Sequence, residues 1–85
     1  MTIKNELLKG NDFLRTGDLS MAAVIFLFKP LEGVDRQDPK RAQFIFKRSQ
    51  ELNDLVTKFQ RKELKVEPLA YFAALREIKA RLYER

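Results

Sequence analysis

The side chains that could do chemistry in this chain are lysine, arginine, carboxylates and hydroxyls, because the sequence contains no histidine and no cysteine. Histidine is the commonest general base, and both residues are common ligands of transition metals. The glycines, Gly10, Gly17 and Gly33, are too scattered to form a phosphate-binding loop. We therefore expect no enzymatic activity, no catalytic residue and no cofactor.

Basic side chains are the most concentrated of the reactive groups. Residues 29–66 hold ten lysines and arginines against six acidic residues, and the formal net charge of the chain is +5. Such an excess favours contacts with phosphate, which depend on salt. A solvated face with cations placed at helix ends explains the same pattern, since no base-reading motif accompanies it. The candidate anion or nucleic-acid contacts are Lys47, Arg48, Lys58, Arg61, Lys62 and Lys65.

Three carboxylates, Glu32, Asp35 and Asp38, surround a predicted turn. Spaced carboxylates can hold Mg²⁺ or Ca²⁺. Their spacing matches no EF-hand loop, and Arg36 lies among them, so we predict no metal site.

The length of 85 residues suits one domain with a modest core. Residues 1–12 are predicted to form an N-terminal arm or a short helix, and residues 13–85 a single α+β domain. The longest apolar run, Met21 to Phe28, is too short to span a membrane, which needs about 20 residues. No signal peptide is recognisable, and the lack of cysteine fits a reducing compartment, so we expect a cytoplasmic protein.

The first regular element after the arm is predicted over residues 19–28. Asp18 is a good N-cap, and the segment is apolar almost all round, which is typical of a buried helix. Val24 to Phe28 also suits a strand, but Met21 and the two alanines after it favour the helix. The residues before it, 12–16, are expected to be extended.

A β-hairpin is predicted next, with strands over residues 31–35 and 41–47 and a turn at 36–40. Ala42, Phe44 and Phe46 share one face of the second strand, and Arg41, Gln43, Ile45 and Lys47 share the other, which predicts one buried face.

Ser49 is expected to cap an amphipathic helix whose apolar stripe is Leu52, Leu55, Val56 and Phe59. An ion pair of Asp54 with Lys58 is predicted on its wet side, because the spacing is i,i+4.

Pro68 suits the first position of a final helix. Its apolar stripe is Tyr71, Leu75, Ile78 and Leu82, and Glu77 and Arg81 form a predicted i,i+4 pair. Tyr71 and Tyr83 are expected at the edge of the core with their hydroxyl groups in water. Four alanines could permit close helix approach in a dimer, although alanine is also the best helix former. These candidate self-association residues are Ala70, Ala73, Ala74 and Ala80.

The order of these features resembles a small family of bacterial and phage-associated proteins catalogued only as a domain of unknown function. The matching residues run from Thr16, Asp18-Leu19 and Ala22-Ala23 through Phe44, Phe46, Ser49, Glu51-Leu52, Leu55-Val56 and Phe59 to Val66, Pro68, Phe72, Ala74-Leu75-Arg76, Lys79 and Leu82-Tyr83. The resemblance covers about residues 13–83. It implies an α+β domain of helix, hairpin, helix, link and helix, and it implies no activity or site.

The sequence therefore predicts a small α+β domain with a short antiparallel hairpin packed against about three helices. We expect a non-catalytic protein-interaction or assembly module, with a protein partner or a second copy of the chain as its ligand. The alternative is a nucleic-acid-binding accessory protein that contacts phosphates through the basic cluster. We expect neither a membrane nor a small-molecule substrate as a partner.

Overall fold

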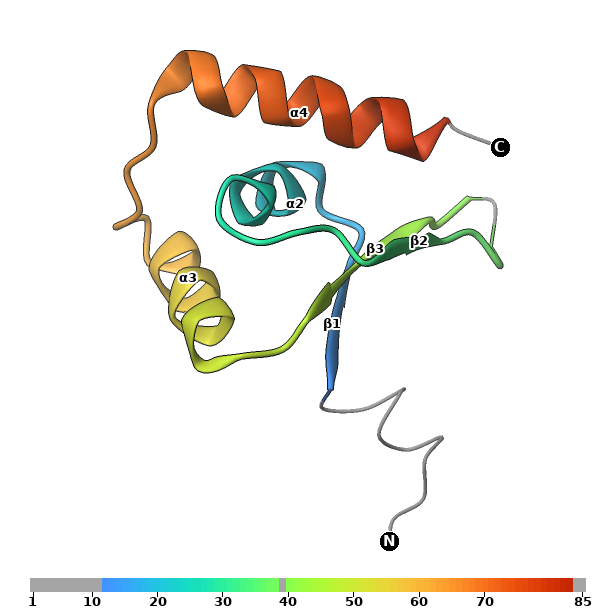
Figure 1. Cartoon of the computed structure of the whole chain (residues 1–85), viewed down its shortest axis with the longest axis horizontal. Helices are drawn as coiled ribbons and strands as arrows, with labels where there is room; N and C mark the ends of the chain where they lie inside the picture. Colours follow the sequence, from blue (N-terminus) through green and yellow to red (C-terminus); the bar gives the residue numbers. More distant parts are fainter. Residues whose placement is uncertain (1–11, 39, 84–85) are drawn as a thin grey trace, which may run out of the picture.

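The computed structural model describes residues 12–38 and 40–83. Its elements are β1 (Phe13–Thr16), α2 (Leu19–Phe26), β2 (Gly33–Asp35), β3 (Gln43–Lys47), α3 (Gln50–Gln60) and α4 (Pro68–Leu82) (Figure 1). The α+β class and the helices predicted around residues 19–28, 50–60 and 68–82 are confirmed. Apart from Asp12, the predicted N-terminal arm lies outside the described residues.

The sheet has three antiparallel strands in the order β1-β3-β2. The predicted hairpin is its β2–β3 half, with Val34 opposite Phe44. The segment expected only to be extended is a third strand, in which Leu14 lies opposite Phe46. β3 is thus the central strand of the sheet.

The helices cover one face of this sheet. Phe44 and Phe46 are almost fully buried beneath them, whereas Gln43 and Ile45, which alternate with them along β3, are only half-buried on the other face. On that open face the Arg15 guanidinium pairs with the Asp35 carboxylate at 2.7 Å. Because Arg15 and Gly33 both lie opposite Ile45, this ion pair links the two edge strands across β3.

α2 lies between the sheet and α4, so apolar side chains are needed around most of its circumference. Ala22, Ala23, Val24 and Ile25 are all buried. The helix begins as predicted at Asp18, whose carboxylate accepts hydrogen bonds from the backbone N–H groups of Ser20 and Met21. The strand alternative for this segment is therefore wrong.

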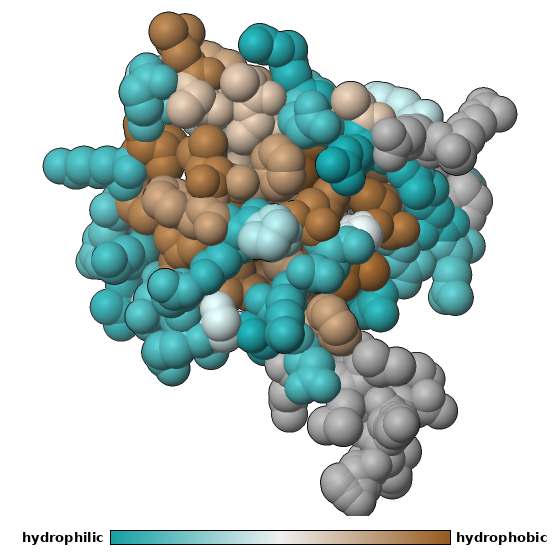
Figure 2. Space-filling view, viewed as in Figure 1, coloured by the Kyte–Doolittle hydropathy of each residue, from teal (hydrophilic) through white to brown (hydrophobic). Residues whose placement is uncertain are grey.

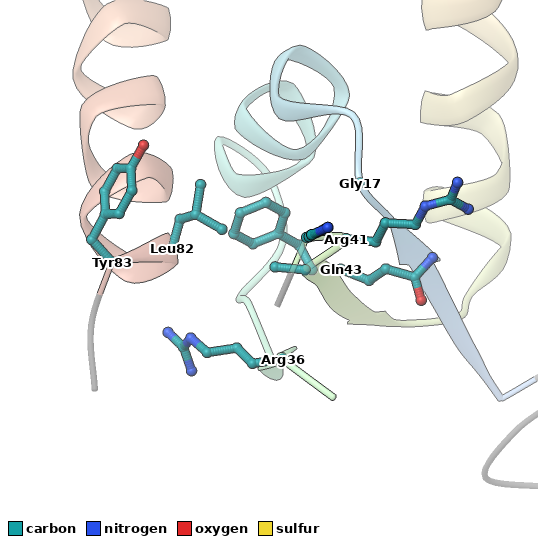
Figure 3. Close-up of a pocket in the computed structure, with 9 residues that line it drawn as sticks. Gly17, Arg36, Arg41, Gln43, Leu82 and Tyr83 are labelled. Atoms are coloured by element: carbon teal, nitrogen blue, oxygen red, sulfur yellow. The ribbon is translucent and has the colours of Figure 1, made fainter. Parts of the chain in front are cut away.

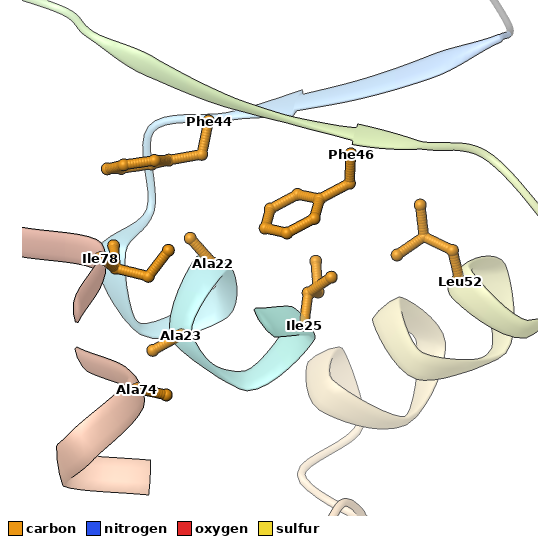
Figure 4. Close-up of a cluster of buried hydrophobic side chains, with 8 residues drawn as sticks. All are labelled: Ala22, Ala23, Ile25, Phe44, Phe46, Leu52, Ala74 and Ile78. Carbon is orange, nitrogen blue, oxygen red and sulfur yellow. The ribbon is translucent and has the colours of Figure 1, made fainter. Parts of the chain in front are cut away.

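The core forms where α4 and α3 meet α2 and the sheet (Figure 4). Ala74 and Ile78 of α4 contact the small side chains of α2, and the phenyl rings of Phe44 and Phe46 point down from β3. Leu52 closes the cluster from α3. Small residues on α2 allow α4 to approach closely, and this is how a short chain obtains a well-packed interior.

No helix in the described part of the chain is both long enough and apolar enough to cross a membrane.

Candidate functional site

The six basic residues singled out from the sequence fall in two places rather than one. Lys47 and Arg48 precede the N-terminus of α3, and Lys58, Arg61 and Lys62 lie at or after its last turn, with Lys65 in the following link. α3 has 11 residues and is therefore about 16 Å long, which separates the two groups. Arg48 also donates a hydrogen bond from Nη1 to the Asn53 side-chain oxygen at 3.1 Å.

The group at the C-terminus of α3 also has a structural explanation. The N–H of Lys62 donates to the carbonyl of Phe59 at 3.0 Å, and the N–H of Glu63 donates to the carbonyl of Lys58 at 2.9 Å. These two bonds form a Schellman motif, in which Lys62 has a φ of 62°. Cations here also complement the negative end of the helix dipole, so part of the basic cluster belongs to the ending of the helix.

A different set of cations lines a pocket with a volume of about 780 Å³. Arg36, Lys40 and Arg41 come from the turn between β2 and β3, and Leu82 and Tyr83 come from the end of α4 (Figure 3). The remaining lining residues are Gly17, Ala42, Gln43 and Phe44. The sequence places the three cations in one turn, but it gives no sign that this turn meets the end of α4.

Arg36 links the β2–β3 turn to the C-terminal end of α4. Its Nη2 donates a hydrogen bond to the main-chain carbonyl of Arg81, one of the last carbonyls of α4. In Figure 3, Arg36 extends toward the end of α4, whereas Arg41 and Gln43 extend to the opposite side. Cations therefore stand on both sides of an apolar floor to which Leu82 and Phe44 contribute.

Two of the three carboxylates near the turn, Asp35 and Asp38, have partners close to it. Asp35 pairs with Arg15 and accepts the backbone N–H of Gln37, and Asp38 accepts the backbone N–H of Lys40. Within the residues that the structure describes, no group of three potential metal ligands is found. These side chains stabilise the turn that carries the cations of the pocket.

Two other carboxylates have perturbed acidities. The hydroxyl of Ser20 and the backbone N–H groups of Met21 and Ser20 stabilise the charged form of Asp18, which lowers the pKa of its carboxyl. The Lys29 ammonium donates a hydrogen bond to Glu51 and lowers the pKa of that carboxyl. Both groups act in the fold, one at the start of α2 and one between α3 and the end of α2.

The remaining predicted ion pairs differ in outcome. Glu77 and Arg81 are paired at 3.3 Å, as predicted. Asp54 instead accepts a hydrogen bond from the Gln50 side chain at 3.0 Å, which takes the place of the predicted pair with Lys58.

The alanines predicted to mediate self-association divide between two faces of α4. Ala74 is buried against α2 within the chain, whereas Ala70, Ala73 and Ala80 are exposed. A second stripe of α4 faces away from the core at i, i+3, i+4 and i+7 spacing. We call it the outer α4 face: Leu69, Phe72, Ala73, Ala80 and Tyr83, with Arg76 among them.

Large apolar side chains on this outer α4 face are in water. Leu69 is 76% exposed, Phe72 54% and Tyr83 78%. Tyr83 therefore does not lie at the edge of the core, as the sequence predicted, whereas Tyr71 is half-buried there. Figure 2 shows apolar side chains gathered over the upper part of this view, where α4 lies, with polar side chains over the lower part.

Fold and surface together define a small basic α+β domain in which a three-stranded antiparallel sheet is covered on one face by helices. The chain belongs to the family described as domain of unknown function DUF5659, whose model matches residues 11–84. This agrees with the resemblance drawn from the residues between Thr16 and Tyr83. No curated protein and no solved structure was found to be similar to the chain.

Proposed function

We propose that this domain is a non-catalytic protein-interaction or assembly module that docks through the outer α4 face. The observation that carries the proposal is the exposure of Leu69, Phe72 and Tyr83 along one side of a helix whose other side is already buried. Exposed apolar patches of this kind mark interaction surfaces more often than scattered single residues do. Aromatic residues and arginine, both present here, are enriched in the energetically important part of interfaces.

Self-association is one form of this proposal. Ala73 and Ala80 lie next to the large apolar residues, so a second helix could approach α4 closely. A second copy would bury the outer α4 face of both chains at once, since a two-fold interface uses the same patch twice. The other form is docking on a different protein. For either form we propose a cytoplasmic location, because a chain without cysteine fits a reducing compartment in which disulfides are rare.

The test is sedimentation of the wild-type chain and of Leu69→Ser/Phe72→Ser over a wide concentration range. We expect the wild type to associate and the double variant to sediment as a monomer with an unchanged melting temperature, because both positions are exposed. Phe28→Ser is the matched control, since Phe28 is 52% exposed but lies outside α4. If the wild type is a strict monomer and pull-downs with the wild type and the double variant recover the same proteins, the outer α4 face is not the docking surface.

A nucleic-acid-binding accessory protein is the second candidate. The observation in its favour is the clustering of Lys58, Arg61 and Lys62 at one end of α3, where they can reach neighbouring phosphates. The direct test is the affinity of Lys58→Gln/Arg61→Gln for a labelled oligonucleotide, compared with that of the wild type.

A further inference from the structure

The pocket between the β2–β3 turn and the end of α4 combines positive charges with an aromatic ring and apolar side chains. Arg36, Lys40 and Arg41 supply three positive charges, and no carboxylate is among the described residues that line it. Cations that line a concave surface raise the local concentration of anions. The ligand expected here is therefore negatively charged.

The shape of the pocket excludes a small compact anion as the best fit. A volume of about 780 Å³ lies in the range of sites that hold whole organic ligands, which is about 300–1,000 Å³. Arg36 and Arg41 extend to opposite sides in Figure 3, which suits a ligand with several negative charges better than one with a single charge. A polyanion that crosses the pocket could contact them in turn.

The uncharged groups of the pocket suit a nucleobase. The ring of Tyr83 is 78% exposed at the rim, and base stacking on such rings occurs in proteins that bind single strands. Leu82 and Phe44 contribute an apolar floor.

We infer that this pocket binds single-stranded nucleic acid, with phosphates on Arg36, Lys40 and Arg41 and one base against Tyr83. A free nucleotide offers the same phosphate and base but cannot reach both sides of the pocket, so it should bind more weakly than a strand. An acidic polypeptide offers charge without a planar ring. Double-stranded nucleic acid hides its base faces and should bind more weakly than the single strand. The inference does not rest on the proposal that the domain docks through the outer α4 face, so either can fail without the other.

The experiment is a fluorescence anisotropy titration of the full chain with labelled single strands of about 12 nucleotides, at about 50 and 150 mM salt. Competitors are the matching duplex, a nucleoside monophosphate and polyglutamate. We expect saturable binding at low salt, weaker binding at higher salt, and competition in the order single strand, duplex, monophosphate.

The variants separate the pocket from general attraction by charge. Arg36→Gln/Arg41→Gln should lose about tenfold or more in affinity, whereas Lys58→Gln/Arg61→Gln removes the same charge elsewhere and should lose about twofold. Tyr83→Ser should lose about fivefold or more, because base stacking on an aromatic ring is worth at least about 1 kcal/mol. Tyr83→Phe keeps the ring and should retain binding.

Arg36→Gln also removes the hydrogen bond to the carbonyl of Arg81, so the melting temperature of each variant is measured first. If Arg36→Gln unfolds the protein, the affinities of Arg41→Gln, Tyr83→Ser and Tyr83→Phe test the inference instead. No binding at about 50 mM salt overturns the inference. The inference is also overturned if Lys58→Gln/Arg61→Gln loses as much affinity as Arg36→Gln/Arg41→Gln, or if the duplex binds as tightly as the single strand. The same holds if polyglutamate of matched charge competes as well as the single strand.

Discussion

Replacing Lys62 by glycine should make this domain more stable, although it removes a cation from the candidate phosphate contacts. Lys62 holds the left-handed position of the Schellman motif that ends α3, with a φ of 62°. For a residue with a Cβ, this conformation costs about 1–2 kcal/mol of folding free energy, and for glycine it has no such cost. Glycine also makes the unfolded chain more flexible, which favours unfolding by about 0.5–1 kcal/mol and offsets part of the gain. The net gain expected for Lys62→Gly is about 0.5–1 kcal/mol.

For a domain of this size, such a gain raises the melting temperature by about 3–6 °C. Thermal and urea unfolding followed by far-UV circular dichroism would measure it, provided that unfolding is two-state. Lys62→Ala is the matched control, because it removes the same charge but keeps the Cβ, so it should not be stabilised. Equal melting temperatures for the two variants would refute the conformational argument. If Lys62 contacts phosphate, both variants should lose the same affinity for an oligonucleotide, so the pair also separates structure from binding.

Two further predictions concern the core and the first helix cap. Ile78→Ala removes a fully buried side chain between α4 and α2 and should cost about 2–5 kcal/mol, a large part of the stability of an 85-residue domain, as measured by urea unfolding. Asp18→Ala should cost about 1 kcal/mol through loss of the α2 cap. Because folding lowers the pKa of Asp18, its charge stabilises the fold above about pH 4, and this contribution is lost as the pH falls through the folded-state value. The stability advantage of the wild type over Asp18→Asn should therefore shrink in unfolding series taken below about pH 4, and an advantage that grows there would contradict the assignment.

The elements with strong local signals were predictable from the sequence. The structure confirms Ser49 as the cap of α3, and of the predicted apolar stripe Leu52 is buried and Leu55, Val56 and Phe59 are half-buried. The hairpin was predictable because Phe44 and Phe46 fall on the same face of one strand, and this is its buried face. In each case the signal lies within one short segment, so no knowledge of distant contacts was needed.

β1 and the exposure of α4 were not predictable in this way. β1 has four residues and becomes a strand through pairing with β3, which lies about thirty residues further along the chain. α4 carries apolar residues on two sides, and only the position of α2 decides that Ile78 is buried while Phe72 is exposed. The pocket depends in the same way on the turn of the hairpin reaching the end of α4. Both candidate sites therefore lie where tertiary contacts, rather than local patterns, fix the surface.

The layering of the domain links the two sites. A small domain must bury one layer against the next, and here α2 is the middle layer, so α4 is left with one side uncovered. The C-terminal end of that side carries Tyr83, which belongs to the outer α4 face and also lines the cationic pocket. A partner that covers Tyr83 and a strand that stacks on it would compete for one ring.

Binding at the two sites should then be coupled, and linkage requires the coupling to be reciprocal. A saturating single-stranded oligonucleotide is expected to weaken self-association in sedimentation runs, and Leu69→Ser/Phe72→Ser, which abolishes association, should bind the oligonucleotide at least as tightly as the wild type. Tyr83→Phe should preserve the competition, because the ring and not the hydroxyl is shared. If association is unchanged by saturating oligonucleotide in the wild type, the two ligands do not share Tyr83, and the placement of a base against that ring is wrong.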